Sequence, residues 1–164
     1  MNLPYLPPGR EILYVPIAHP HMQAAKTVAE TQSLDPDHPT GAVVALDNEI
    51  IGQGANGSHF HKKNGCERKK RNIPTGQGYE LCEGCHPKNH AEQKAIANAR
   101  EGDKREERID IQPNHKSKIT NHISLDIYLW GHWWCCQSCW AKMIEFGINN
   151  VYLPEGAEQM FRKH

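Results

Sequence analysis

A histidine and a glutamate two residues apart, followed further along the chain by two cysteines at CxxC spacing, constrain this sequence more than any other feature. The first pair is His90 and Glu92 in the segment NHAEQKAI, and the second is Cys136 and Cys139 in HWWCCQSCW. Each pair stands at the start of a segment with the apolar spacing of a helix. If the two pairs form one site, the fold must bring the starts of both helices to the same place.

The length and composition favour a single soluble domain. The chain has 164 residues, with 19 basic and 19 acidic side chains and a formal net charge of zero. A domain of this size can fold without disulfides, and balanced charge does not favour non-specific binding to nucleic acid. No apolar run approaches the roughly 20 residues that span a bilayer. The first residues lack a basic segment followed by an apolar core, so we expect no secretory signal and a cytoplasmic location.

The apolar pattern predicts an α/β domain. Helices are expected at residues 21–34, 90–101 and 136–146. Strands are expected at residues 42–46, 49–51, 123–130 and 149–153, and an Asp47-Asn48 turn joins the first two into a hairpin. This order predicts a mixed sheet with an antiparallel hairpin at one side and parallel strands at the other.

The remaining segments have less regular patterns. Residues 1–18 are rich in proline and aromatic residues, and we interpret them as a strap along the surface. Residues 103–122 are polar and are expected to form a loop, and residues 155–164 are expected to add one or two helical turns. Residues 57–88 lack apolar periodicity, and a loop of this length is unusual in a compact domain unless something orders it.

His90, Cys136 and Cys139 have the residue types of a catalytic zinc site. Zinc held by three protein groups keeps a fourth position open for water or substrate. A helix N-terminus favours negative charge and lowers thiol pKa values, so cysteines at such a position suit thiolate ligands. Glu92 lies two residues after His90 and is the candidate general base that takes a proton from the attacking water.

The two motifs together are far more specific than either alone. An H-x-E triplet is frequent by chance, and a C-x-x-C pair is more typical of structural zinc or a redox dithiol. Their joint occurrence in this order matches the zinc deaminase pattern H-x-E followed by P-C-x-x-C. The chain resembles the cytidine and deoxycytidylate deaminase family from about Gly41 to Leu153, and within it the deoxycytidylate branch. GAVVALDNEIIGQGANGS is similar to the hairpin of that family, and WAKMIEFGINNVYL is similar to its last helix and strand.

The resemblance implies both a fold and a reaction. The fold is a cytidine-deaminase-like three-layer α/β/α arrangement with a mixed five-stranded sheet, formed by residues 1–164 as one domain. The reaction is hydrolysis of a C–N bond in a cyclic amidine, with conversion of dCMP to dUMP as the expected case. Glu92 is implied to carry a proton from water to the ring nitrogen and to help protonate the leaving ammonia. The family also implies a homo-oligomer.

Three residues are implied to contact the substrate. Asn56, after the hairpin, is implied to bind the sugar or position the base, although Asn56-Gly57 is also a strong turn sequence. The backbone of Ala91 and the ring of Trp134 are implied to line the base pocket. The chain departs from the family at Cys135, where proline is usual, and at His132, where threonine is usual. These departures concern the substrate more than the chemistry.

The insertion at residues 57–88 has the composition of a second zinc site. Cys66, Cys82 and Cys85 supply three thiols, and one imidazole completes a closed structural set. His61 is the preferred fourth ligand, then His59, because His86 directly follows Cys85 and needs a tight turn to join. Metal binding supplies folding free energy and explains how a polar insertion is ordered. Some deoxycytidylate deaminases are similar, with an extra zinc in the same insertion. The alternative is a loop with free cysteines.

The same insertion is strongly basic. Between residues 62 and 71 it carries Lys62, Lys63, Arg68, Lys69, Lys70 and Arg71. One interpretation is a clamp for a nucleotide phosphate, and the simpler one is a solvated basic loop. Two other substrates fit the motifs: a free base or nucleoside such as cytosine, cytidine or guanine, and a base within RNA or DNA, which the neutral net charge disfavours. A non-catalytic zinc module has no need of Glu92.

Overall fold

A mixed five-stranded sheet forms the centre of the protein. The computed structural model describes residues 3–102 and 124–162, so the loop expected at 103–122 lies outside the described residues. The strands are β1 (Ile12–Val15), β2 (Gly41–Leu46), β3 (Glu49–Ala55), β4 (Leu125–Trp130) and β5 (Asn150–Pro154). Their order is β1-β5-β4-β2-β3, with β1, β5 and β4 parallel and β2 antiparallel to both of its neighbours. The predicted mixed sheet, with its hairpin at one side, is therefore confirmed.

The strap interpretation of residues 1–18 is wrong for β1. Ile12–Val15 forms an edge strand that pairs in parallel with β5, with Ile12 opposite Val151. The composition Ile-Leu-Tyr-Val suits a strand, but the flanking prolines concealed it. A strand this short at a sheet edge has no hairpin partner, so only the distant β5 reveals it.

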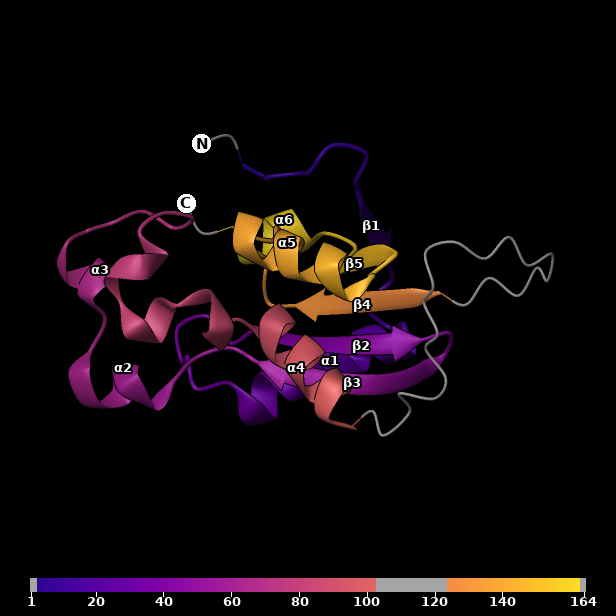
Figure 1. Cartoon of the computed structure of the whole chain (residues 1–164), viewed down its shortest axis with the longest axis horizontal. Coiled ribbons are helices and arrows are strands. Elements are labelled where there is room, and N and C mark those ends of the chain that lie inside the picture. Colours follow the sequence, from indigo (N-terminus) through magenta and orange to yellow (C-terminus); the bar gives the residue numbers. More distant parts are fainter. Residues whose placement is uncertain (1–2, 103–123, 163–164) are drawn as a thin grey trace.

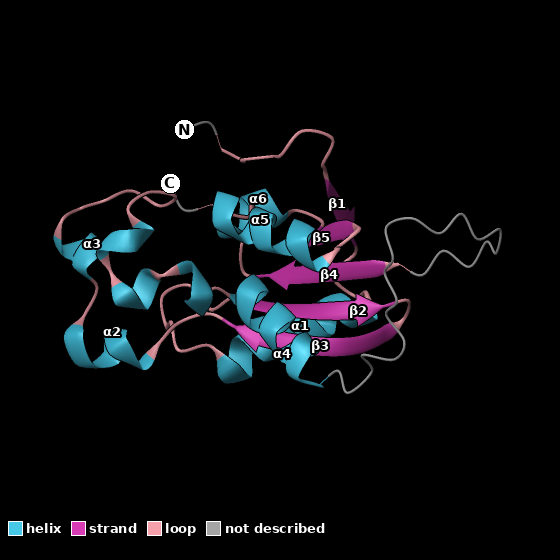
Figure 2. Cartoon of the chain, in the orientation of Figure 1, coloured by secondary structure: helices cyan, strands magenta, loops and turns pink. Residues whose placement is uncertain are grey.

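Helices cover both faces of the sheet and complete the three layers (Figures 1 and 2). The long helices are α1 (Pro20–Gln32), α4 (Ala91–Gly102) and α5 (Gln137–Phe146), and α6 (Ala157–Phe161) is short. Helix α1 buries Met22 and Val28 against one face, and α4 and α5 bury Ile96 and Met143 against the other. This arrangement is the α/β/α fold expected from the sequence.

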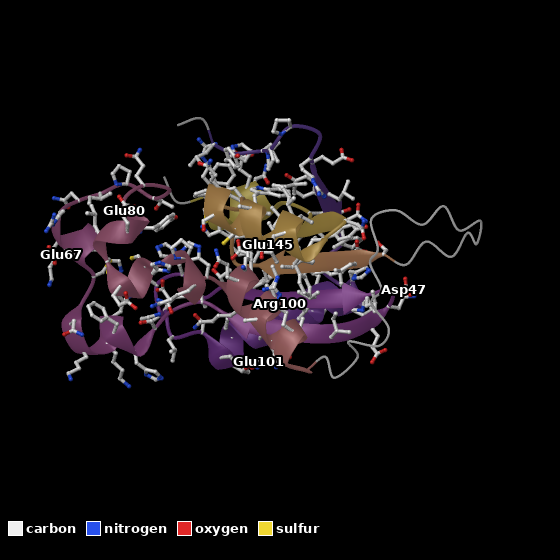
Figure 3. All side chains as sticks on the ribbon, viewed as in Figure 1. Asp47, Glu67, Glu80, Arg100, Glu101 and Glu145 are labelled. Carbon is white, nitrogen blue, oxygen red and sulfur yellow. The ribbon has the colours of Figure 1, made fainter. Side chains whose placement is uncertain are left out.

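Two glycines in β3 let α4 approach the sheet closely. A Cβ atom added at Gly52 or Gly54 would come within about 2.5 Å of the backbone of Ala95, so no side chain fits there. Helix α5 lies beside α4, where Arg100 and Glu145 form an ion pair at 3.7 Å between Nη2 and Oε1 (Figure 3). The beginnings of α4 and α5 are thereby fixed at the same end of the sheet.

The insertion is folded into short helices and forms a lobe beyond that end of the sheet, at the left of Figure 1. Its helices are α2 (His59–Asn64), α3 (Glu67–Lys70), η1 (Tyr79–Leu81), η2 (Glu83–Cys85) and η3 (Pro87–Asn89), the last three being 3₁₀ turns. The lobe buries few side chains, among them that of Cys82. None of the described helices is long and apolar enough to cross a membrane.

Candidate metal centre and active site

His90, Cys136 and Cys139 converge at the shared end of α4 and α5. His90 immediately precedes α4, Cys136 caps the start of α5, and Cys139 lies in the first turn of α5. The Nδ1 atom of His90 lies 3.5 Å from Sγ of Cys136 and 3.4 Å from Sγ of Cys139. The two predicted motifs therefore form one cluster.

The geometry of this cluster suits zinc. Tetrahedral coordination with bonds of about 2.0 to 2.3 Å separates ligand atoms by roughly 3.5 Å, close to the separations found here. A hydrogen bond from the Cys139 thiol, with the nearby His90 ring, lowers the pKa of Cys136 to about 4. One thiolate is thus favoured even without an ion, as a zinc ligand requires. Among the described residues only these three protein groups converge, so a zinc ion held by them would keep a fourth position for water or substrate, and His90 and Cys136 line a pocket.

Glu92 lies beside this cluster in the first turn of α4. Its side chain is buried, with 6% of the residue exposed. Burial disfavours the charged carboxylate and raises its pKa. A carboxylate whose pKa is raised above its ordinary value holds a proton more readily, which suits a group that accepts a proton from water and then returns it. Glu92 is not a member of the three-ligand cluster.

Cys135 contacts this carboxylate, which the sequence motif did not predict. The residue is fully buried, and its thiol lies close to the Glu92 side chain. The proline usual in the family has no thiol. The motif showed that position 135 is unusual, but only the fold shows that its side chain faces the carboxylate.

A pocket of about 410 Å³ opens over the cluster and Glu92. Its walls come from the end of the hairpin, the insertion, the β4–α5 loop and the C-terminal segment; Thr40, Tyr79, His132, Trp133 and Arg162 are among the lining residues. A volume of this size accommodates a small-molecule ligand. The lobe is therefore part of the pocket rather than a remote appendage.

Asn56 lines the pocket, but most of its amide is already engaged. Its Oδ1 atom accepts hydrogen bonds from the Ser33 hydroxyl at 2.6 Å and the Thr40 backbone N–H at 2.8 Å. Its Nδ2 atom donates to the His38 carbonyl at 2.8 Å. One amide hydrogen is left for a ligand. The turn interpretation and the substrate interpretation of Asn56 are thus compatible.

The other two predicted substrate contacts also line the pocket. Ala91 is fully buried at the first position of α4, where backbone N–H groups have no partner within the helix. Trp134 is 3% exposed. The ring of His132 meets that of Trp134 edge to face, with centroids 5.2 Å apart. Burial lowers the pKa of His132 to about 4, so its imidazole is neutral at pH 7.

The insertion contains the second predicted cluster. His61, Cys66, Cys82 and Cys85 place their ligand atoms within 4.8 Å of one another. His61 Nε2 lies 3.2 Å from Cys82 Sγ, and the sulfurs of Cys66 and Cys85 are 3.4 Å apart. Three sulfurs and one imidazole form a closed set that suits structural zinc. His61 is thus the imidazole that converges, and neither alternative histidine belongs to the group.

Two arginines of the insertion, Arg68 and Arg71, are engaged by protein groups rather than free for a phosphate. Arg71 extends along α3 and donates from Nε to Glu67 at 2.9 Å. Arg68 lines the pocket, but its Nε donates to the Gln77 carbonyl at 2.8 Å and its Nη2 to the Pro74 carbonyl at 2.7 Å. Its guanidinium therefore braces a loop. Net charge alone could not reveal these partners.

Comparisons with known proteins give one family match. A family model described as "Cytidine and deoxycytidylate deaminase zinc-binding region" matches residues 17–155. A search of curated proteins found no match.

Among solved structures, the chain is similar to dCMP deaminase of the cyanophage S-TIM5. The apo form shows 17% identity and a TM-score of 0.45, over 87% of this chain and 86% of that chain. The complex with dCMP and dUMP shows 18% identity and a TM-score of 0.43, over 85% and 83%.

A third solved structure is a diaminohydroxyphosphoribosylaminopyrimidine deaminase/5-amino-6-(5-phosphoribosylamino)uracil reductase from Thermotoga maritima. It shows 20% identity and a TM-score of 0.40, over 81% of this chain and 28% of that one. The family model covers most of the chain and both motifs of the metal cluster. This protein belongs to the cytidine and deoxycytidylate deaminase family.

Proposed function

We propose that this protein is a zinc-dependent hydrolytic deaminase of a pyrimidine nucleotide and converts dCMP to dUMP. The observation that carries the proposal is the three-ligand cluster of His90, Cys136 and Cys139, which opens into a pocket beside the buried Glu92. An open ligand position next to a carboxylate of raised pKa suits hydrolysis and has no use in a purely structural site.

The chain's own residues have separate tasks in this reaction. A zinc ion held by the cluster would act as a Lewis acid and lower the pKa of water, so that water is nucleophilic at neutral pH. Glu92 accepts a proton as the water oxygen bonds to the amino-bearing ring carbon, and it delivers that proton to the adjacent ring nitrogen. A second proton transfer accompanies cleavage of the C–N bond and release of ammonia. Ala91 contributes a backbone N–H, Asn56 its remaining amide hydrogen, and Trp134 an aromatic wall.

A second zinc at His61, Cys66, Cys82 and Cys85 is part of the proposal. Its role is structural, because four protein ligands leave no open position. The short helices of residues 57–88 contribute little apolar burial, so a bound ion supplies the free energy that holds them in place. The homo-oligomer implied by the family stays a prediction.

A free nucleoside or base is the second candidate substrate. The bonding of Arg68 favours such a substrate. Arg68 is the Lys or Arg of the insertion that lines the pocket, and it already donates hydrogen bonds to loop carbonyls instead of being free for a phosphate. Arg162 also lines the pocket, where its guanidinium lies 5.1 Å from the Trp133 ring. Its Nη1 pairs with Glu158, whose exposed carboxylate a phosphate can replace, so a nucleotide remains the first candidate.

Ammonia release decides between these substrates. Purified zinc-loaded protein is assayed with dCMP, deoxycytidine, cytidine, cytosine and guanine under identical conditions. We expect the largest kcat/KM for dCMP. Equal or greater values for deoxycytidine would move the assignment to nucleosides, and no release from any of the compounds would contradict the proposed function. The Glu92→Gln variant serves as the inactive control.

A further inference from the structure

Cys85 connects two clusters of possible metal ligands. The insertion cluster is His61, Cys66, Cys82 and Cys85, and the catalytic cluster is His90, Cys136 and Cys139. Its sulfur belongs to the insertion cluster, 3.4 Å from Sγ of Cys66 and 3.5 Å from Nε2 of His61. Its backbone carbonyl lies close to the ring of His90, whose Nδ1 faces the thiols of the catalytic cluster. Cys85 therefore belongs to one cluster through its sulfur and lies next to the other through its main chain.

Tyr79 forms a second connection. Its ring meets the His90 ring edge to face, with centroids 4.9 Å apart and an interplanar angle of 82°. The guanidinium carbon of Arg68 lies 4.4 Å from the Tyr79 centroid, and Nη1 of Arg68 lies 3.6 Å from Cys85 Sγ. Side-chain contacts thus run from a sulfur of the insertion cluster through Arg68 and Tyr79 to the catalytic histidine.

The main chain between the clusters is closely tied together. The Nδ2 atom of Asn89 donates to the carbonyls of Glu83 at 2.9 Å and Gly84 at 3.3 Å. The backbone N–H of His90 donates to the Pro87 carbonyl at 2.9 Å. Two short 3₁₀ turns, η2 and η3, fill this segment, so a displacement of Cys85 is transmitted to His90.

The position of the His90 ring depends on these contacts. Metal binding through Nδ1 requires the ring proton on the other nitrogen, and a backbone carbonyl that accepts that proton fixes both the tautomer and the ring orientation. Loss of such an outer partner typically weakens metal binding about 10- to 100-fold. The Cys85 carbonyl is positioned to be such a partner, the Tyr79 ring packs against the same imidazole, and the insertion cluster holds Cys85 in place.

We propose that the insertion cluster controls the metal affinity of the catalytic cluster, with Cys85 and Tyr79 as positioning residues for His90. The inference rests on the proposed function in one respect, namely that both clusters bind zinc. A filled insertion cluster holds the His90 ring in its ligating orientation, and an empty one releases it. The lobe therefore forms a wall of the pocket and also keeps His90 in the orientation that binds the catalytic metal.

Zinc release from the full-length, zinc-loaded protein tests the coupling. The wild type and Cys66→Ser are titrated with a chromophoric chelator, and Cys139→Ser identifies the release that belongs to the insertion cluster. Cys66 does not contact His90, so its loss acts on the catalytic cluster only through the connection. We expect the remaining zinc of Cys66→Ser to bind about 10- to 100-fold more weakly than the catalytic zinc of the wild type. Unchanged affinity would overturn the coupling.

A matched pair at Tyr79 keeps the test independent of the folding of Cys66→Ser. Tyr79→Phe retains the ring edge against His90, whereas Tyr79→Leu removes it, and both leave every metal ligand in place. We expect Tyr79→Phe to keep the zinc affinity of the catalytic cluster and Tyr79→Leu to lower it several-fold. Both variants should retain the zinc of the insertion cluster. Equal affinities in the two variants would remove Tyr79 from the connection. Arg71→Ala, which removes an exposed neighbour of Arg68, is the control.

The two proposals fail in distinguishable ways. Zinc release from two independent clusters, together with ammonia release by the wild type, would overturn the coupling alone. A wild type that binds one zinc but releases ammonia would overturn the coupling and the structural zinc, and leave the deaminase intact. A protein that binds two zincs cooperatively without releasing ammonia would refute only the proposed reaction.

Discussion

His90 Nδ1 lies 3.4 Å from Cys139 Sγ, although the two residues are 49 positions apart in the sequence. The contact exists because α4 and α5 lie side by side and begin at the same end of the sheet. Cys136 lies 3.5 Å from the same nitrogen. A single ion is therefore expected to need all three residues, and each of them is testable by itself.

Loss of one thiol should remove the catalytic metal. In Cys139→Ser, a weakly coordinating hydroxyl replaces a thiolate in a set of only three ligands. We expect the protein to lose one zinc per chain and its deaminase activity, while the insertion zinc remains. Metal analysis and ammonia release on the same sample check this. Ser138→Ala, an exposed neighbour on α5, should keep both, and a Cys139→Ser sample with full zinc would exclude Cys139 as a ligand.

Glu92→Gln should separate metal binding from catalysis. Glutamine preserves the shape of the side chain but cannot accept the proton. We expect zinc content to stay at the wild-type level and turnover to fall by about 10²- to 10⁴-fold. Glu101→Gln makes the same change at the far, exposed end of α4 and should have little effect (Figure 3). Loss of zinc would make Glu92 a ligand, and near-normal turnover would place the base elsewhere.

Two clusters predict two zinc ions per chain. Metal analysis of protein purified without added zinc should therefore give a value close to two. Cys82→Ser should remove one ion and lower the melting temperature by several degrees, because the buried Cys82 helps to hold the lobe together. A single zinc in the wild type, with reactive thiols at Cys66, Cys82 and Cys85, would refute the insertion site.

Most of the fold and the ligand residues could be predicted because they depend on local patterns. Helical spacing identified α1, α4 and α5, and the residue types and spacing of His90 and Cys136 identified the metal cluster. Strand β1 was missed because it pairs only with β5, at the other end of the chain. A short edge strand between prolines carries too little local information to stand out.

The interior of the site could not be predicted, because its contacts depend on the path of the insertion. Tyr79 reaches His90 only after several short helices without apolar periodicity have turned the chain back. Cys135 was recognisable as an unusual residue, but its contact with Glu92 depends on how β4 leads into α5. Arg68 was assigned by charge, and charge does not determine which groups a guanidinium meets.

Arg68 should affect stability more than phosphate recognition. Arg68→Ala removes hydrogen bonds to the Gln77 and Pro74 carbonyls and the contact with the Tyr79 ring. We expect a lower melting temperature and a similar loss of kcat/KM for dCMP and deoxycytidine. Arg71→Ala should change neither, because Arg71 pairs with Glu67 on the exposed side of α3. A rise in KM for dCMP but not for deoxycytidine in Arg68→Ala would instead support the interpretation of Arg68 as a phosphate-binding residue.

His132 should make the protein less stable as the pH falls. Burial lowers the pKa of His132 to about 4 from its ordinary value of 6.5. Between these two values the unfolded chain binds a proton that the folded chain excludes, so the free energy of unfolding decreases as the pH falls from 6.5 towards 4. At about 1.4 kcal/mol per pKa unit, the loss reaches at most about 3.5 kcal/mol.

The variant His132→Thr, which introduces the residue usual in the family, should remove this dependence. Denaturant unfolding at pH 7 and pH 5 should give a smaller difference in unfolding free energy for His132→Thr than for the wild type, whatever constant cost the smaller side chain adds at both values. Protonation of the other titrating groups contributes to both proteins, so the difference between them reports His132 together with its Coulombic coupling to His90. His59→Thr, which removes an exposed imidazole on α2, controls for the substitution itself. Equal differences in His132→Thr and the wild type would mean that the imidazole of His132 is accessible to protons in the folded protein.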